Sequence, residues 1–583
     1  MTEFRVWAPR PARVALVLGW DRSGAGERRP MRRAERGWWS LEVAGAGPGT
    51  DYGFELDGEG PFPDPRSPFQ PAGVHGPSRT VDHGAFPWTD GGWRVESLAD
   101  AVFYELHVGT FSAEGTFEGA IEHLDAVADL GVTHVELMPV GEFPGRRGWG
   151  YDGVDLYAPH HAYGGPDGLR RLVDACHARS LAVVIDVVYN HLGPDGNYLS
   201  RFGPYFSHRY TTPWGDAVNF DGPGSDEVRS FVMDNARMWI HDYHVDGLRL
   251  DAVHEIFDQS AVHILEELAT IVHAAADGLE RPVVVVAESD LNNPRLVQQP
   301  DAGGYGLDAQ WNDDYRHALH TTLTGETDAF HGQYRGIPDL ATALRRVFVF
   351  DGRYSPFRDR RHGRPVRDVP ATSFVAFAQN HDQVGNRALG ERLAQLVGPD
   401  RLRVAAAFVV LGPFVPLLFA GEEWGASSPF QYFTDHQDPD LAEAVRRGRA
   451  REFAHSVGAH GVVPDPQDPA TFERSRLRWS ERSTGPNAAL LDWYRRLIAF
   501  RRDHPGLRDG TLPSVRYDEE AGWITAERGG YVVAANLSAG RVTVPLEAGH
   551  DGRATVALAS VDGIGLAGDR LDLPPWSVAV IAR

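Results

Sequence analysis

The chain contains no lysine, so all 57 of its basic residues are arginine. This absence excludes a Walker-type phosphate-binding lysine and a catalytic Schiff-base lysine. Cysteine occurs only once, as Cys176, which rules out an intrachain disulfide and a thiolate metal cluster. Cys176 lies in a helix-like segment, where a buried small hydrophobic residue is a better interpretation than a reactive thiol.

Long apolar runs and excess positive charge are also missing. The run from Val404 to Ala420 contains Gly and Pro and is shorter than a bilayer span. The opening MTEFRVWAPR has no apolar core of a signal peptide, so we expect a cytoplasmic location. The net charge of −23 at pH 7 disfavours nucleic acid and anionic membranes as partners. A neutral or cationic small-molecule substrate fits this charge better.

The order of strand and helix patterns divides the 583 residues into three parts. Residues 1–90 show short strands separated by Gly, Pro and Asp, which predicts a small β-sandwich. Residues 91–507 alternate apolar runs with helix-compatible segments, which predicts a (β/α)8 TIM barrel with a short insertion at about 191–227. Residues 508–583 return to strand patterns, so the predicted fold is an α/β barrel flanked by N-terminal and C-terminal β-sandwiches.

Eight apolar runs make up the predicted barrel, and four of them end in polar residues. In a parallel barrel the carboxyl ends of the strands converge on one face, where catalytic groups lie. A single charged residue there could be a structural hydrogen-bond partner, but four such strand ends favour an active site. The runs cover 101–111, 131–140, 181–191, 245–253, 283–289, 306–312, 373–382 and 413–423, and the polar ends are Asp186, Asn190 and His191, then Arg249 and Asp251, then Glu288, then His381 and Asp382.

Three of these carboxylates suit the cleavage of a glycosidic bond. That reaction needs an acid for the leaving oxygen and a carboxylate across the anomeric carbon. Asp251 is the predicted nucleophile, because Arg249 lies two residues back on the same strand face and favours its charged form. Glu288 is the predicted acid/base, because its apolar strand should raise its pKa. Asp382 is predicted to stabilise the oxocarbenium-like charge.

Two histidines beside these carboxylates are predicted to bind sugar hydroxyls. They are His191 and His381. Metal ligation by the same pair is the competing interpretation, but no HExxH-like helical pair accompanies them. No cofactor and no required metal are expected, since no carboxylate cage for calcium is evident.

Aromatic side chains could supply flat faces for sugar rings. Tyr151, in GWGYDG, is favoured for stacking because glycines flank it in a loop at the barrel mouth. For Trp149 and Trp424, stacking and core packing stay open as alternatives. Asp152, next to Tyr151, and Arg249 are included among the predicted substrate contacts.

The motifs resemble a known family of enzymes. DVVYNH at 186–191, GLRLD at 247–251, Glu288 in VVAESD and NHD at 380–382 resemble the four signature regions of the α-amylase superfamily of glycoside hydrolases. The resemblance covers about residues 100–505. It implies a retaining mechanism with Asp251 as nucleophile, Glu288 as acid/base and Asp382 as transition-state stabiliser.

Longer sequence segments resemble particular members of that superfamily. FRVWAP at 4–9 resembles the N-terminal sandwich of branching enzymes, isoamylases and trehalohydrolases, and QNHDQVGNRALGERL at 379–393 resembles the trehalohydrolases in particular. This implies maltooligosyltrehalose or a related α-glucan as substrate, hydrolysis of the α-1,4 bond next to the terminal trehalose, and a maltooligosyltrehalose synthase as pathway neighbour. His254 and Glu255 lie where related enzymes contact the plus-one sugar, although either residue could instead support the following helix.

Two other functions stay open from the sequence. The nearer one is a glycogen branching or debranching enzyme, which shares the N-terminal sandwich and the three carboxylates. The more remote one is a non-catalytic glucan-binding protein on a decayed barrel. Decay should remove at least one catalytic carboxylate, and all three are present.

Overall fold

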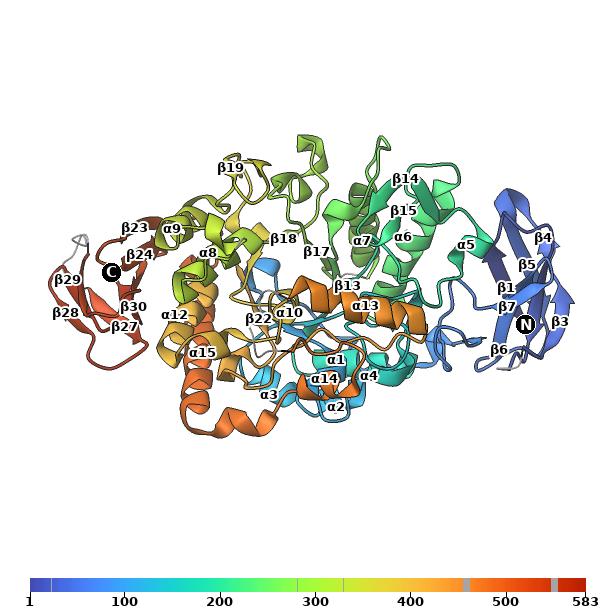
Figure 1. The fold of residues 1–583 in the computed structure, drawn as a ribbon, viewed down its shortest axis with the longest axis horizontal. Helices are drawn as coiled ribbons and strands as arrows, with labels where there is room; N and C mark the ends of the chain where they lie inside the picture. The colour runs from blue at the N-terminus through green and yellow to red at the C-terminus, as the bar shows by residue number, and fades with distance from the viewer. Residues whose placement is uncertain (22–23, 280, 329, 455–461, 547–553) are drawn as a thin grey trace.

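The computed structural model describes residues 1–583 except 22–23, 280, 329, 455–461 and 547–553. The molecule is elongated, with a β-sheet domain at each end and the barrel between them (Figure 1). The two chain termini lie in the two opposite end domains. The predicted fold class is confirmed.

A closed ring of eight parallel strands forms the centre of the molecule. Every residue of these strands is buried, as expected for strands that are covered on both faces. Each of the eight predicted apolar runs contains one of them. In chain order they are β9 (Phe103–Leu106), β10 (His134–Leu137), β13 (Ala182–Val187), β16 (Gly247–Leu250), β17 (Val284–Ala287), β18 (Ala309–Trp311), β21 (Phe374–Ala376) and β22 (Val415–Phe419).

The helices around the ring are amphipathic. In α6 (Ser225–Asp242) the buried residues recur at intervals of three and four, which places them on the one face that packs inward. In α15 (Gly485–Asp503) a proline occupies the first turn and Pro505 follows the end, so prolines mark both ends of the helix. Other long helices are α4 (Gly165–His177), α7 (Ile264–Gly278), α8 (Asp313–Thr324), α9 (Ile337–Arg346), α12 (Pro399–Val410) and α13 (Pro439–Glu452).

The N-terminal domain consists of two antiparallel sheets that dock on α6. Trp38 Nε1 donates to Glu227 at 3.1 Å, and Arg66 pairs with Asp234 at 2.8 Å. One sheet has the order β1 (Thr2–Trp7), β5 (Trp38–Val43), β4 (Arg32–Arg33). The other has β3 (Glu27–Pro30), β2 (Val14–Leu18), β6 (Asp51–Leu56), β7 (Glu59–Phe62), with β8 (Ser78–Arg79) paired to β6.

Two hairpins project from the barrel beside the strand ends. The predicted insertion contains the short helix α5 (Leu199–Phe202) and the hairpin of β14 (Phe206–Thr212) and β15 (Gly215–Val218). A second hairpin, of β11 (Gly141–Glu142) and β12 (Asp155–Pro159), holds the loop 143–154. Both loops reach the site described below.

The C-terminal domain packs its strands against the barrel helices α9 and α12. Arg528 contributes to this interface, because its Nη2 donates to the backbone carbonyls of Leu411, Gly412 and Leu507. The domain has one sheet of β23 (Ser514–Asp518), β24 (Trp523–Arg528), β25 (Tyr531–Asn536), β30 (Ser577–Ala582) and β27 (Thr555–Ala559), and another of β26 (Val542–Pro545), β29 (Arg570–Leu573) and β28 (Gly565–Ala567).

The structure also locates the predicted domain boundaries and the single cysteine. The predicted boundaries after residues 90 and 507 lie in the connections between β8 and β9 and between α15 and β23. Cys176 is fully buried in α4, and burial raises the pKa of its thiol, as expected for a residue that packs in the core. Of the helices in the described ranges, none is long and apolar enough to cross a bilayer. The cytoplasmic location stays a prediction.

Candidate active site

A cavity of about 320 Å³ lies at the carboxyl ends of the barrel strands. It brings together the three predicted catalytic carboxylates, which follow three different strands of the barrel, β16, β17 and β21. The predicted residues that line it are Trp149, Tyr151, His191, Asp251, His254, Glu288, His381 and Asp382.

Arg249 lies buried beneath this cavity and connects its carboxylates. Its Nη1 donates to Asp251 Oδ1 at 2.8 Å and to both oxygens of Asp186, at 2.7 and 2.8 Å. Its Nη2 lies 2.7 Å from Glu288 Oε2. The ring of Trp311 covers the guanidinium at 4.3 Å. Because one guanidinium contacts both Asp251 and Glu288, these two carboxylates face the same space.

The backbone conformation just after Asp251 also positions a hydrogen-bond donor in the site. Ala252 has φ 37° and ψ 52°, a left-handed conformation that is uncommon for a residue with a Cβ atom. In this conformation the Ala252 N–H donates to Glu288 Oε2 at 2.9 Å. Asn190 Nδ2 donates to the other oxygen of Asp251, Oδ2, at 2.9 Å. Strain of this kind often occurs at functional sites, where the surrounding structure maintains it.

Glu288 has the environment expected of a general acid. Burial raises the pKa of its carboxyl, and the charge of Asp251 adds to this effect. Arg249, the Ala252 N–H and His254 act in the opposite direction without cancelling it. The protonated form therefore persists to higher pH than in an exposed glutamate.

Asp382 lies in the first turn of α10 (His381–Gly385). Burial raises the pKa of its carboxyl, His381 opposes this effect, and the charges of Glu288 and Asp313 reinforce it. A positive charge developing in the cavity would favour the ionised form of Asp382.

Tyr151 is held over His381 by a chain of hydrogen bonds. Its hydroxyl donates to Asp186 Oδ2 at 2.6 Å and lies 2.8 Å from His381 Nε2, while the two rings stack at 5.2 Å. Glu105 of β9 accepts from the His381 backbone N–H at 2.9 Å and lies 2.5 Å from Nδ1. Burial alone would lower the pKa of His381, but Glu105 raises it above the usual value. The tyrosine ring is thereby fixed at the cavity wall.

His191 is positioned in a similar way by hydrogen-bond partners on both sides of its ring. Its ring nitrogens lie 2.6 Å from Asn190 Oδ1 and 3.0 Å from the Tyr151 carbonyl oxygen. Burial lowers its pKa to about 4. Its ring stacks on Trp214 at 4.1 Å, and Trp214 is 50% exposed in the turn between β14 and β15. Trp214 therefore offers an open aromatic face at the cavity.

The two histidines have separate partners among the described residues. His191 contacts the backbone oxygen of Tyr151 and His381 contacts its hydroxyl. Within the described ranges, neither belongs to a group of side chains arranged to hold an ion. The ring nitrogens of both histidines already contact protein oxygens, so a sugar hydroxyl would have to share or displace these contacts.

Four predicted substrate contacts lie outside the cavity lining, and Arg249, beneath the cavity, is one of them. Trp424 is only 1% exposed and packs against Trp479 at 5.2 Å, so core packing, the second of its two alternatives, describes it. Asp152 is half-buried with its carboxylate 3.8 Å from His436 Nε2. Glu255 is half-buried in a short 3-10 turn after the nucleophile. Neither Asp152 nor Glu255 reaches the cavity wall.

Two other predicted contacts do reach it. Trp149 lines the cavity, but it is 6% exposed and stacks on Phe430 at 5.2 Å, so it chiefly supports the wall. His254 lines the cavity as well, and its buried Nδ1 has no hydrogen-bond partner within the described ranges.

Several cavity residues were not predicted from the sequence. Trp214 was missed because a tryptophan in a polar insertion has no periodic pattern, although TTPWGD places it near a turn. Glu105, a charged residue within the apolar run FYEL, was a detectable signal. The remaining unpredicted lining residues are Ala252, Ser289, Asp290, Trp311, Asp313, Phe377, Asn380 and Gln383.

Comparisons with known proteins agree with this geometry. Residues 86–210 match the family described as "Alpha amylase, catalytic domain", residues 1–69 match "Carbohydrate-binding module 48 (Isoamylase N-terminal domain)", and residues 514–580 match a domain of unknown function. A crystal structure of a Salmonella typhimurium protein superposes with a TM-score of 0.90 and 40% identity, covering 100% of this chain and 97% of that one. The fold and the site thus define a glycoside hydrolase of the α-amylase superfamily.

Full-length relatives identify the family within that superfamily. The malto-oligosyltrehalose trehalohydrolase of Arthrobacter ramosus is 52% identical over 577 residues, covering 98% of this chain and 99% of the relative. A 1,4-alpha-glucan branching enzyme of Corynebacterium jeikeium is 29% identical and covers 72% of this chain and 60% of the relative. The chain belongs to the malto-oligosyltrehalose trehalohydrolase family.

Proposed function

We propose that this chain hydrolyses the α-1,4 bond next to the terminal trehalose of maltooligosyltrehalose, with retention at the anomeric carbon. Asp251 is the nucleophile, Glu288 the acid/base and Asp382 the stabiliser of positive charge. The observation that carries this proposal is the shared guanidinium of Arg249, which directs Asp251 and Glu288 to one cavity. The relatives that match over their full length support the substrate.

In the first step the Glu288 carboxyl gives its proton to the glycosidic oxygen while an Asp251 oxygen attacks the anomeric carbon. The bond between that carbon and the leaving oxygen breaks, and free trehalose departs. Both protein donors to Glu288, Arg249 and the Ala252 N–H, reach Oε2. Oε1 is therefore the oxygen that carries the transferred proton.

In the second step the ionised Glu288 takes a proton from water, and the water oxygen attacks the same carbon. The bond to Asp251 breaks, and the shortened maltooligosaccharide leaves with its configuration retained. Asp382 stabilises the positive charge that develops on the sugar in both steps. Tyr151 presents a fixed aromatic face to the ring that reacts.

His254 and Trp214 are proposed to bind the trehalose unit. His254 lies three residues after the nucleophile, lines the cavity and has a buried Nδ1 that can bond to a sugar hydroxyl. Trp214 provides the exposed stacking face. Because the 1,1-linkage of the substrate must be made by another enzyme, we infer a maltooligosyltrehalose synthase as the pathway neighbour.

An assay with three substrates tests the proposal. Purified protein is supplied separately with maltooligosyltrehalose, plain maltopentaose and amylopectin, and released trehalose and new branch points are measured. Trehalose is expected from the first substrate alone, and a Glu288→Gln preparation controls for contaminating activity. Remodelling of amylopectin without any release of trehalose would show a branching or debranching enzyme instead.

A further inference from the structure

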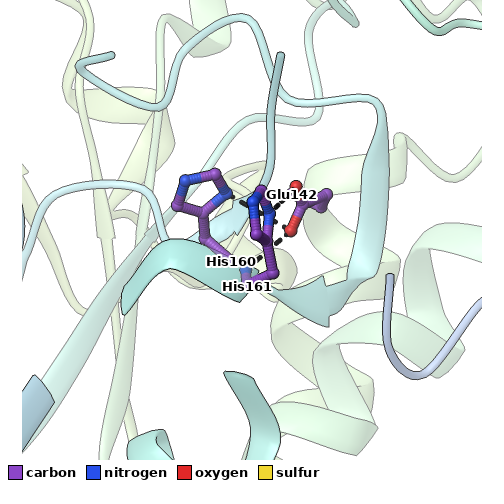
Figure 2. Close-up of side chains that lie close together, drawn as sticks. All are labelled: Glu142, His160 and His161. Atoms are coloured by element: carbon purple, nitrogen blue, oxygen red, sulfur yellow. Dashed lines mark hydrogen bonds and ion pairs between the residues drawn. The ribbon is translucent and has the colours of Figure 1, made fainter. Parts of the chain in front are cut away.

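We propose that Glu142, His160 and His161 form a binding site for one divalent transition-metal ion of the zinc class. The three side chains lie together on the hairpin of β11 and β12 (Figure 2). Their ligand atoms lie within 4.8 Å of one another. The site is separate from the catalytic carboxylates, and the inference does not depend on the proposed substrate.

The distances within this group suit a small ion with little rearrangement. Glu142 Oε2 lies 3.3 Å from His160 Nδ1, and Glu142 Oε1 lies 2.6 Å from His161 Nδ1. Two ligands on a tetrahedral zinc ion, each at about 2.0–2.2 Å, lie about 3.3 Å apart. The first contact already has this separation, and the second requires the half-buried His161 ring to move by several tenths of an ångström.

His160 is the observation that points to a missing ligand. Its side chain is fully buried. Nδ1 lies 3.3 Å from Glu142 Oε2 without the geometry of a hydrogen bond, and Nε2 has no hydrogen-bond partner within the described ranges. Buried polar nitrogens without partners are costly and uncommon. An ion at Nδ1 would satisfy one of the two. Phe143 stacks on the ring at 3.8 Å and Tyr163 lies edge-on at 4.8 Å, so the ring is held in place.

The charge of the group also suits a cation. Glu142 is fully buried, and its two carboxylate oxygens face the Nδ1 atoms of His160 and His161. Two imidazoles and one carboxylate are the ligands that zinc takes in many proteins, whereas calcium prefers oxygen ligands alone. His161 is 18% exposed, which leaves a route for the ion and for a water ligand.

A second group of this composition provides an internal comparison. His320, Glu326 and His331 also lie close together. Both oxygens of Glu326 already pair with Arg387 at 3.0 Å, and Arg316 Nη1 lies 3.2 Å from His331 Nε2. Two guanidinium groups at this second site disfavour a cation, so we expect the ion at Glu142.

The location gives the ion a structural consequence. Glu142 ends β11 and His160 directly follows β12, so the ion would join the two strands of the hairpin that holds the loop 143–154. That loop carries Trp149 and Tyr151 to the cavity. An ion that binds only the folded chain raises its thermal stability.

The test measures metal binding by the full-length protein without a histidine tag. After removal of metals with a chelator, Co²⁺ is titrated in and its visible spectrum is recorded, and bound Zn²⁺ is counted by mass spectrometry. One ion per chain is expected, with a rise in Tm. His161→Gln should weaken binding by about tenfold or more, as loss of a metal-site group commonly does. Glu326→Gln, from the second group, should bind as the parent does.

Three results would overturn the proposal. They are the absence of a Co²⁺ spectrum and of any metal-dependent rise in Tm for the unaltered protein, equal binding by His161→Gln, and loss of the ion in Glu326→Gln. The first readout needs no variant, so it holds even if a substitution at the buried Glu142 prevents folding. Trehalose release is measured separately, because its presence or loss does not bear on metal binding at Glu142.

Discussion

Asp251 and Glu288 both accept hydrogen bonds from Arg249, yet the proposed reaction requires one to attack as an anion and the other to give up a proton. Their immediate partners explain the difference. Asp251 has a protein donor at each oxygen, Arg249 at Oδ1 and Asn190 at Oδ2. Glu288 has both donors at Oε2, and burial raises the pKa of its carboxyl. Two carboxyls that share one arginine therefore have separate roles.

Replacement of Glu288 by glutamine tests its role. The amide keeps the size of the side chain but carries no transferable proton, so kcat/KM should fall by about a hundred- to ten-thousand-fold. Because the raised pKa keeps Glu288 protonated as the pH increases, this carboxyl should set the alkaline limb of the pH profile, and that limb should disappear in the variant. Near-normal turnover, or an unchanged alkaline limb in the residual activity, would exclude Glu288 as the acid.

At the scale of strands and loops, neighbouring barrel strands carry buried glutamates with different surroundings. Glu105 of β9 and Glu136 of β10 are partners in the strand register. Glu105 holds the backbone and ring of His381. Neither oxygen of Glu136 has a hydrogen-bond partner within the described ranges, and burial together with the charge of Glu105 raises its pKa strongly. The first glutamate positions a cavity residue, whereas burial favours the protonated form of the second.

This contrast gives a matched pair of variants. Glu105→Gln should release His381 and Tyr151 and lower kcat by up to about a hundredfold, the cost of a small misplacement in an active site. It should also lower the pKa of His381, which the charge of Glu105 raises. Glu136→Gln should change neither value greatly. Kinetics and histidine NMR titration measure both effects, and equal effects of the two variants would show that Glu105 is no more than a structural residue.

The barrel strands were predictable because each lies in a short, largely apolar run, and four of these runs end in polar residues, as VVVVAES does at Glu288. Residues whose roles depend on tertiary neighbours could not be predicted from such local patterns. Trp424 follows the last strand as a mouth residue would, yet Trp479, distant in sequence, covers it. Trp214 reaches the cavity because the β14–β15 hairpin folds back over His191. Local patterns do not specify such long-range contacts.

For the molecule as a whole, buried neutral histidines predict sensitivity to acid. Burial lowers the pKa of His107 to about 3, of His134 to about 4 and of His320 to about 3, from 6.5 in an unfolded chain. The unfolded chain therefore binds more protons below about pH 6.5, and the free energy of unfolding should fall as the pH drops from there towards about 4. At higher pH these groups should not affect stability.

His134→Gln tests one contribution to this loss. Without that titrating group, the slope of the unfolding free energy against pH should decrease by up to about 1.4 kcal/mol per pH unit in this range. Denaturant unfolding at several pH values measures it. An identical slope in parent and variant would mean that His134 is protonated in the folded barrel.

The barrel domain presents the catalytic cavity, and the central claim is that Asp251 attacks the sugar there. The direct test is to trap the glycosyl-enzyme with a slow fluorinated substrate and to locate the sugar by mass spectrometry of the digested protein. The account predicts one sugar adduct on the peptide that contains Asp251, and none in Asp251→Asn. An adduct on another residue, or the same adduct in the variant, would contradict it.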